Sequence, residues 1–379
     1  MAYELVCVQC GARHDGSKYR LACDQCSSLL DVVYDTPATT EARLVPDARG
    51  TARYLPMLPI VDPANLVTMG EGNTALVVTP RIGQSLGIDD LYIKLECANP
   101  TGSFKDRGNA VQVSVLKETG VTAVADSTGG NAGHSFAAYC ARAGIRFVGF
   151  AEEGNTSRKL QAIAFHGTEI HFVKGDRYAR AAAVRKFCED TGVLYMNYGR
   201  NAYFIEGQKT MAYEIPEQME RLPDHIIVPI GNGSILHGLW RGFQEMLEDG
   251  RVQRIPHLHG AQTEETQPLV AAFNRKKWSP PPGGATSVAN GIGVPQPPRL
   301  DALVQVCRQS GGRPVAVSEA DIIAWQRRLA ELEGLFVEPT SAIVLGAAQT
   351  LRQQGVIRRG DSVLLPLTGF GTKEPIPGQ

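Results

Sequence analysis

Residues 122–133 read TAVADSTGGNAG and contain a predicted strand, a glycine loop and the start of a predicted helix. Residues 122–126 are short, mostly apolar and partly β-branched, which predicts a buried strand. Small residues interrupt the pattern from Ser127, and an apolar helical stretch begins at Asn131. Because small side chains leave the backbone N–H groups at a helix start accessible, this loop is suited to bind a carboxylate.

The same order of strand, loop and helix recurs along most of the chain. The predicted strands are 122–126, 145–150, 169–173, 225–230 and 362–367. The predicted helices are 105–118, 131–142, 158–166, 178–190, 206–219, 235–247, 319–333 and 341–353. This alternation, with few adjacent strands, predicts an α/β fold in which helices cover both faces of parallel sheets.

Three further glycine segments lie where ligands bind in such folds, beyond the carboxyl ends of strands. NPTGSFKDRG at 99–108 predicts a tight turn into a helix whose first turn carries Lys105. The positive end of a helix dipole lowers the pKa of a lysine, which favours a nucleophilic amine, although a solvated lysine is the alternative. PIGNGSI at 229–235 has the form of a phosphate cup, and LTGFG at 367–371 follows the last strand. The P-loop and GxGxxG patterns are absent, which argues against a nicotinamide enzyme.

Four of the eight cysteines fall within the first 26 residues, in the pattern C-x2-C-x12-C-x2-C. Two thiolate pairs of this spacing predict a tetrahedral Zn²⁺ site formed by Cys7, Cys10, Cys23 and Cys26. Two disulfides and unbound cysteines are the alternatives. The N-terminus shows neither the basic segment nor the apolar core of a secretory signal, which predicts a cytoplasmic, reducing location.

The charge balance gives no electrostatic footprint for nucleic acid. Lys and Arg number 38 and Asp and Glu 39, so the formal net charge is −1. No stretch approaches the ~18 uninterrupted apolar residues of a membrane span. We therefore expect neither a nucleic-acid partner nor a membrane partner.

Taken together, the motifs resemble the fold-type II pyridoxal phosphate (PLP) enzymes of the tryptophan synthase β-like superfamily, and among them the threonine synthase family. The resemblance runs from about Gly70 to Lys373, and its most specific segment is NPTGSFKDRG. The other segments are GEGNTALV (70–77), YIKLE (92–96), STGGNAG (127–133), EGQKT (206–210), PIGNGSI (229–235), VEPTSA (337–342) and LTGFGT (367–372). A zinc-ribbon-like N-terminal extension occurs in part of this family.

The resemblance implies a role for each matched residue. Lys105 is expected to bind PLP covalently and then to serve as general base and acid. Asn131 is expected to contact the 3′-oxygen of the cofactor, and Thr368 its pyridine nitrogen. The phosphate is expected to be held by Gly231, Asn232, Gly233, Ser234 and Ile235. Candidates for binding the substrate carboxylate are Thr128, Gly129, Gly130 and Asn131.

The implied fold has two open, doubly wound parallel-sheet domains with a PLP cleft between them, plus a small N-terminal zinc-ribbon-like segment. The expected boundaries are 1–35 for the zinc-ribbon-like segment, 36–68 for a connector, 65–109 with 206–379 for the large PLP-binding domain, and 110–205 for a small mobile domain. The family also implies a homodimer and a small-molecule amino-acid substrate.

The implied reaction is a PLP-dependent elimination or replacement at Cβ or Cγ of an amino acid. A hydroxyl at Thr368, unlike a carboxylate, does not favour a protonated ring, which suits expulsion of a leaving group better than transamination. The chain departs from the family at Phe204, where threonine synthases place a phosphate-binding arginine, and at Gly199, where they place a serine. Residues 290–295 also lack the family's arginine, and Arg200 lies next to Gly199.

Two alternatives follow from these departures. One is a specialised β-replacement synthase or dehydratase-like lyase that does not use O-phosphohomoserine. The other, from a different class, is a catalytically silent zinc-ribbon protein with a binding or regulatory role.

Overall fold

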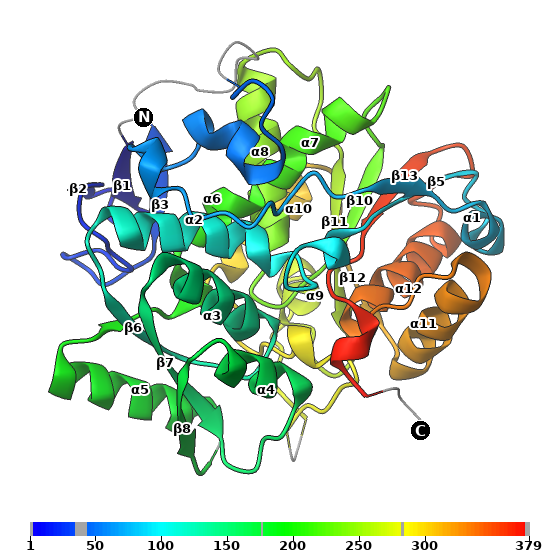
Figure 1. Cartoon of the computed structure of the whole chain (residues 1–379). Coiled ribbons are helices and arrows are strands. Elements are labelled where there is room, and N and C mark those ends of the chain that lie inside the picture. Colours follow the sequence, from blue (N-terminus) through cyan, green and yellow to red (C-terminus); the bar gives the residue numbers. More distant parts are fainter. Residues whose placement is uncertain (1–2, 35–43, 176, 282–283, 376–379) are drawn as a thin grey trace. The chain divides into compact units, whose positions relative to one another are not determined.

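The computed structural model describes residues 3–34, 44–175, 177–281 and 284–375. Figure 1 shows the helices and strands in the order of the chain. The chain divides into two compact units. Unit 1 consists of Met1–Asn73 and Lys105–Thr210, and unit 2 of Thr74–Phe104 and Met211–Gln379. The predicted α/β class with parallel sheets is confirmed in both units. Within the described ranges, no helix combines the length and apolarity needed to cross a membrane. The predicted domain boundaries and the mobility of residues 110–205 stay predictions.

Unit 1 contains a four-stranded parallel sheet in the order β8-β7-β6-β9. Its strands are β6 (Ala123–Ser127), β7 (Arg146–Glu152), β8 (Glu169–Val173) and β9 (Leu194–Tyr195). Its helices are α2 (Lys105–Glu118), α3 (Asn131–Ala143), α4 (Arg158–Phe165), α5 (Arg177–Thr191) and α6 (Ala202–Gln208). Val124 and Phe147 pack with α3 and α4, whereas the alternate residues Ala125 and Val148 pack with α5. Because successive side chains of a strand point to opposite faces, this alternation produces a doubly wound sheet.

The cysteine-bearing N-terminal segment forms a three-stranded antiparallel sheet in the order β2-β1-β3. Its strands are β1 (Tyr3–Cys7), β2 (Arg13–Asp15) and β3 (Leu30–Tyr34). Leu5, Leu30 and Val32 belong to the same buried cluster as Val111 of α2 and Tyr203 of α6. The N-terminal sheet is therefore part of the core of unit 1.

Unit 2 contains a six-stranded sheet in the order β12-β11-β10-β13-β5-β4. The strands are β4 (Leu76–Val78), β5 (Asp90–Lys94), β10 (His225–Pro229), β11 (His257–Thr263), β12 (Pro314–Val317) and β13 (Ser362–Pro366). All pairs are parallel except β4 with β5. Its helices are α1 (Pro80–Leu86), α7 (Thr210–Gln218), α8 (Ser234–Glu248), α9 (Pro268–Phe273), α10 (Leu300–Gln309), α11 (Glu319–Glu333) and α12 (Pro339–Gln353). Every residue of β10 and β13 is buried, as expected for strands covered on both faces.

One predicted helix proved to be two. Residues 206–219 were expected to form a single helix, but α6 ends at Gln208 and α7 begins at Thr210. The Thr210 hydroxyl donates a hydrogen bond of 2.7 Å to the Gly207 carbonyl, so a side chain satisfies a carbonyl at the end of α6. This local capping bond marks the break between the two helices.

A chain of hydrogen bonds joins two buried histidines at the amino ends of β10 and β11. The Arg313 N–H donates to His259 Nδ1 at 3.1 Å, so the proton of neutral His259 is on Nε2. His259 Nε2 lies 3.0 Å from His225 Nδ1, and His225 Nε2 lies 3.1 Å from the Asp361 carboxylate. Burial, reinforced by the neighbouring histidines, lowers the pKa of His259 to about 3.

We expect the stability of unit 2 to fall as the pH falls from about 6.5 towards 3. In this window the unfolded chain binds a proton at His259 that the folded chain does not bind, so stability changes by about 1.4 kcal/mol per pH unit. Urea unfolding midpoints at several pH values test this. His259→Gln should be less stable at neutral pH but should lose less stability on acidification. An identical pH dependence in both proteins would contradict the assignment.

Candidate active site

The segment before Lys105 pairs with the segment that follows β13. Ser103 forms an antiparallel bridge with Gly369, and the Phe104 N–H donates to the Thr368 carbonyl at 3.0 Å. The turn between β5 and α2 closes through the Gly102 N–H, which donates to the Asn99 carbonyl at 2.7 Å, with Gly102 at φ +74°. The predicted tight turn is therefore present, and Lys105 follows it directly as the first residue of α2.

Two aromatic side chains of unit 1, Tyr198 and Phe204, lie beside the Lys105 amine. Lys105 Nζ is 5.5 Å from the ring centroid of Tyr198 and 5.6 Å from that of Phe204. These two rings meet edge to face at 6.1 Å, and Phe204 is only 1% exposed. A Cβ added to Gly108 would lie 2.5 Å from the Phe204 ring, so the ring packs directly on the backbone of α2. The position where the family carries an arginine is thus occupied by a buried apolar group.

The Thr368 hydroxyl is held by a partner that sequence reasoning had not assigned. Ser341 Oγ, in the first turn of α12, lies 3.0 Å from Thr368 Oγ1 and accepts the Gly369 N–H at 2.7 Å. Both side chains are buried. The VEPTSA motif contained Ser341, but nothing in the motif indicated which strand end it would contact. Ser341 fixes the orientation of Thr368.

The loop between β10 and α8 presents a row of backbone donors. Among the described residues, none accepts a hydrogen bond from the backbone N–H groups of residues 231–235. Gly231 and Gly233 are buried there, and a Cβ on Gly233 would lie 2.3 Å from the Leu303 side chain. Consecutive N–H groups at a helix start bind anions, so this loop fits a phosphate group such as that of PLP.

The loop between β6 and α3 was predicted to bind a substrate carboxylate. Asn109, one turn after Lys105 on α2, donates to the Ala132 carbonyl at 3.3 Å, so the first turns of α2 and α3 are adjacent. The Thr128 N–H is already bonded to the Phe150 carbonyl, and Thr128 Oγ1 is buried against Gly133, where a Cβ would lie 1.4 Å away. The roles of Thr128, Gly129, Gly130 and Asn131 toward substrate stay predictions.

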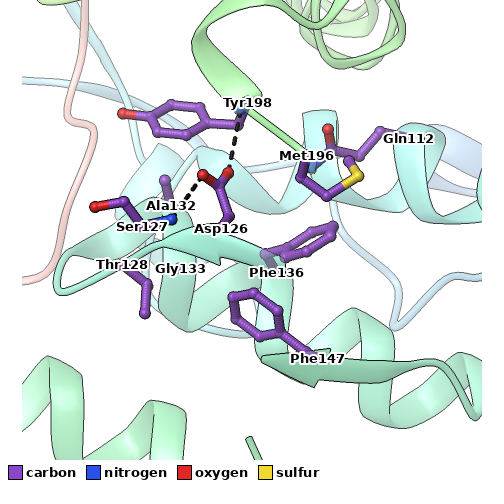
Figure 2. A pocket seen from close by; sticks show the side chains of 10 residues that line it. All are labelled: Gln112, Asp126, Ser127, Thr128, Ala132, Gly133, Phe136, Phe147, Met196 and Tyr198. Carbon is purple, nitrogen blue, oxygen red and sulfur yellow. Dashed lines mark hydrogen bonds between the residues drawn. The ribbon is translucent and has the colours of Figure 1, made fainter. Parts of the chain in front are cut away.

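A pocket lies beside this loop in unit 1 (Figure 2). It is lined partly by Gln112, Phe136 and Met196, and the Asp126 carboxylate stands at its edge. Asp126 accepts hydrogen bonds from the Ser127 N–H at 2.7 Å and the Tyr198 N–H at 3.2 Å (Figure 2). Burial raises the pKa of Asp126 to about 7, although both N–H groups favour the charged form. The sequence places Asp126 at the end of a strand and the start of the glycine loop, and the structure adds its hydrogen bond to the Tyr198 backbone.

The four N-terminal cysteines converge. The Sγ atoms of Cys7, Cys10, Cys23 and Cys26 all lie within 4.8 Å of one another. Three Sγ separations are 3.4, 3.6 and 3.7 Å, too long for disulfides and close to the edge of about 3.8 Å expected for a tetrahedral Zn–thiolate site. None of the four cysteines forms a disulfide.

The two cysteine pairs sit in matching turns. The residue after each pair has a positive φ: Gly11 at +71° and Ser27 at +57°. The Gly11 N–H donates to the Cys7 carbonyl at 3.1 Å, and the Ser27 N–H to the Cys23 carbonyl at 2.9 Å. Each pair is therefore closed by a tight turn, and the set of four sulfur donors suits Zn²⁺.

Comparisons with known proteins agree with this arrangement. Residues 67–369 match the family described as pyridoxal-phosphate dependent enzyme. The chain is 35% identical to the threonine synthase of Methanocaldococcus jannaschii over 97% of its own length and 92% of that protein. It is 34% identical to the threonine synthase of Synechocystis over 85% of its own length and 82% of that protein.

Solved structures share the fold. Maize serine racemase superposes with a TM-score of 0.69 at 21% identity, covering 79% of this chain and 88% of that chain. An O-ureido-L-serine synthase superposes with a TM-score of 0.66 at 20% identity, covering 80% of this chain and 90% of that chain. The family model matches most of the chain, and the curated threonine synthases match it over most of their own length. This chain therefore belongs to the PLP-dependent enzymes, in the threonine synthase family.

Proposed function

We propose that Lys105 binds PLP covalently and that residues 231–235 hold its phosphate. The row of backbone N–H groups without an acceptor among the described residues carries this proposal, because it offers five donors to one anion. In the same proposal, Asn131 contacts the 3′-oxygen and Thr368, oriented by Ser341, faces the pyridine nitrogen. Gly129 and Gly130, with Thr128 and Asn131, receive the substrate carboxylate.

The chain's own groups would then carry the proton transfers. When bound, PLP supplies an electron sink conjugated to the substrate Cα. The Lys105 amine removes the Cα proton and later returns a proton, acting first as general base and then as general acid. Tyr198 and Phe204 exclude water from one side of this amine. The Thr368 hydroxyl places no negative charge opposite the ring nitrogen, which favours loss of a leaving group from Cβ or Cγ.

The N-terminal cysteines are proposed to bind one structural Zn²⁺ through Cys7, Cys10, Cys23 and Cys26. Their matched turns and Sγ separations support this. We also propose a homodimer in the cytoplasm, without a nucleic-acid partner, on the strength of the family resemblance and the balanced charge. Because the chain belongs to a family of enzymes, the catalytically silent alternative is not retained.

The buried Phe204 ring favours a substrate other than O-phosphohomoserine. Threonine synthase relatives support the first candidate, a threonine synthase-like reaction on an amino acid with a γ-phosphate. An aromatic side chain cannot replace a bidentate guanidinium–phosphate contact. The second candidate is therefore a β-replacement synthase or dehydratase-like lyase whose leaving group carries less charge.

We expect Lys105→Ala to abolish the absorption band of the lysine-bound cofactor and to lower turnover by roughly 10³-fold or more. Lys117→Ala is the matched control, since Lys117 lies on the exposed face of the same helix and bonds to the Ala64 carbonyl. The control should keep both the band and the activity. A wild type that takes up no PLP would refute the assignment of Lys105.

We expect O-phosphohomoserine to be a poor substrate. The loss of a charge-assisted contact predicts a kcat/KM roughly 10- to 100-fold below that of the matching O-acetyl amino acid. Release of inorganic phosphate and formation of threonine, measured beside acetate release, decide between the candidates. Efficient threonine formation would show that Phe204 does not exclude the phosphate.

We expect one Zn²⁺ per purified chain by elemental analysis. Cys10→Ser should lower the zinc content and the melting temperature, because structural zinc contributes directly to folding free energy. Cys188→Ser, which changes a thiol on α5 outside the cluster, should leave the zinc content at one. A zinc-free wild type that melts unchanged in a chelator would count against the site.

A further inference from the structure

We propose that the N-terminal sheet positions helix α6, and through it the Phe204 ring, beside the Lys105 amine. Tyr19 and Tyr34 are its positioning residues. The inference rests on the proposed role of Lys105, and all the contacts that carry it lie within unit 1.

The carboxyl end of α6 is held by Tyr34, the last residue of β3. The Tyr34 hydroxyl donates to Glu206 Oε2 at 2.5 Å, and Lys209 Nζ lies 2.7 Å from the same oxygen. Lys209 Nζ also lies 4.4 Å from the centre of the Tyr34 ring. Glu206 and Lys209 are 0% exposed. A buried ion pair depends on its surrounding hydrogen bonds, so the Tyr34 hydroxyl fixes where this pair, and hence the end of α6, can lie.

The amino end of α6 is held by Tyr19. Asn201 caps the helix, because its Oδ1 accepts the Phe204 N–H at 3.1 Å, and its Nδ2 donates to the Tyr19 hydroxyl. The Tyr19 ring lies 5.1 Å from that of Tyr203. Arg200 donates to the Ser27 carbonyl at 2.7 Å, directly after the second cysteine pair. Tyr19 and Ser27 lie in the segment that joins β2 to β3, so this segment holds the cap of α6, while Tyr34 of β3 holds its other end.

The opposite side of α6 packs tightly on α2, the helix that begins with Lys105. A Cβ on Gly207 would lie 2.0 Å from the Arg107 carbonyl oxygen, and a Cβ on Gly108 would lie 2.5 Å from the Phe204 ring. Arg107 also donates to the Thr210 hydroxyl at 3.0 Å. Because packed interiors transmit small displacements, a shift of α6 moves Phe204 relative to the Lys105 amine.

If the N-terminal sheet stabilises unit 1 without positioning α6, substitutions in it are expected to have different effects. If the sheet only covers Val111, Val115 and Ala202, substitutions in it lower the melting temperature and leave the Lys105 environment unchanged. Readouts at the lysine and along α6 therefore separate positioning from simple coverage.

The test uses Tyr19→Phe and Tyr34→Phe in the full chain, each removing one hydroxyl and keeping the ring. Arg13→Gln is the matched control, because Arg13 pairs with Glu4 on the exposed side of the same sheet. Amide hydrogen exchange is measured without added PLP over residues 198–209 and at the start of α2. Cofactor absorption, PLP dissociation constant, kcat and KM are measured on the loaded protein well below its melting temperature.

We expect both tyrosine variants to exchange faster over residues 198–209, to shift the cofactor band and to weaken PLP binding by about tenfold. The control should match the wild type in all these readouts. Lower melting temperatures with unchanged exchange over α6 and an unchanged band would overturn the proposal. If the wild type takes up no PLP, the proposed function fails, while the exchange measurement still decides whether the sheet positions α6.

Discussion

The parallel pairing of β5 with β13 is the constraint on which the unit 2 part of the site depends. Parallel neighbours end at the same edge of a sheet, so the segments that leave them meet there. This brings residue 104 and residue 368, from distant parts of the chain, within one backbone hydrogen bond. The bond joins the Phe104 N–H to the Thr368 carbonyl, so it holds the last residue before Lys105 through the backbone alone.

Features encoded by neighbouring residues could be predicted from the sequence. Helix α11 has the same bounds as predicted, because the Ser318 hydroxyl accepts the Asp321 N–H at its start and Gly334 ends it at φ +70°. The positions of the glycine loops and of Lys105 at the start of a helix were also predicted, since each lies in a continuous motif. Local capping and turn signals act over a few residues, and these are visible in one sequence.

Features that depend on distant contacts were missed. Strand β11 reads HLHGAQT, which lacks a β-branched run, and it is a strand because β10 and β12 pair with it on both sides. The contacts of two further residues were missed for the same reason. Ser341 contacts Thr368, and Asp126 contacts Tyr198, and each partner is distant in the sequence. The break between α6 and α7 was missed for a different reason, since the helical pattern of the sequence runs through Lys209 without a glycine or proline at the break.

The two units contribute different kinds of groups to the proposed chemistry. In unit 2 the proposed phosphate site consists of backbone donors, and a side chain at Gly231 or Gly233 would meet neighbouring atoms there. In unit 1 the Lys105 amine lies beside two aromatic side chains, Tyr198 and Phe204. Backbone donors would allow a chain with no excess of basic residues to bind the proposed phosphate. In the proposed function, the phosphate site therefore depends on the backbone, whereas the preference for a leaving group depends on the side chains at Tyr198 and Phe204.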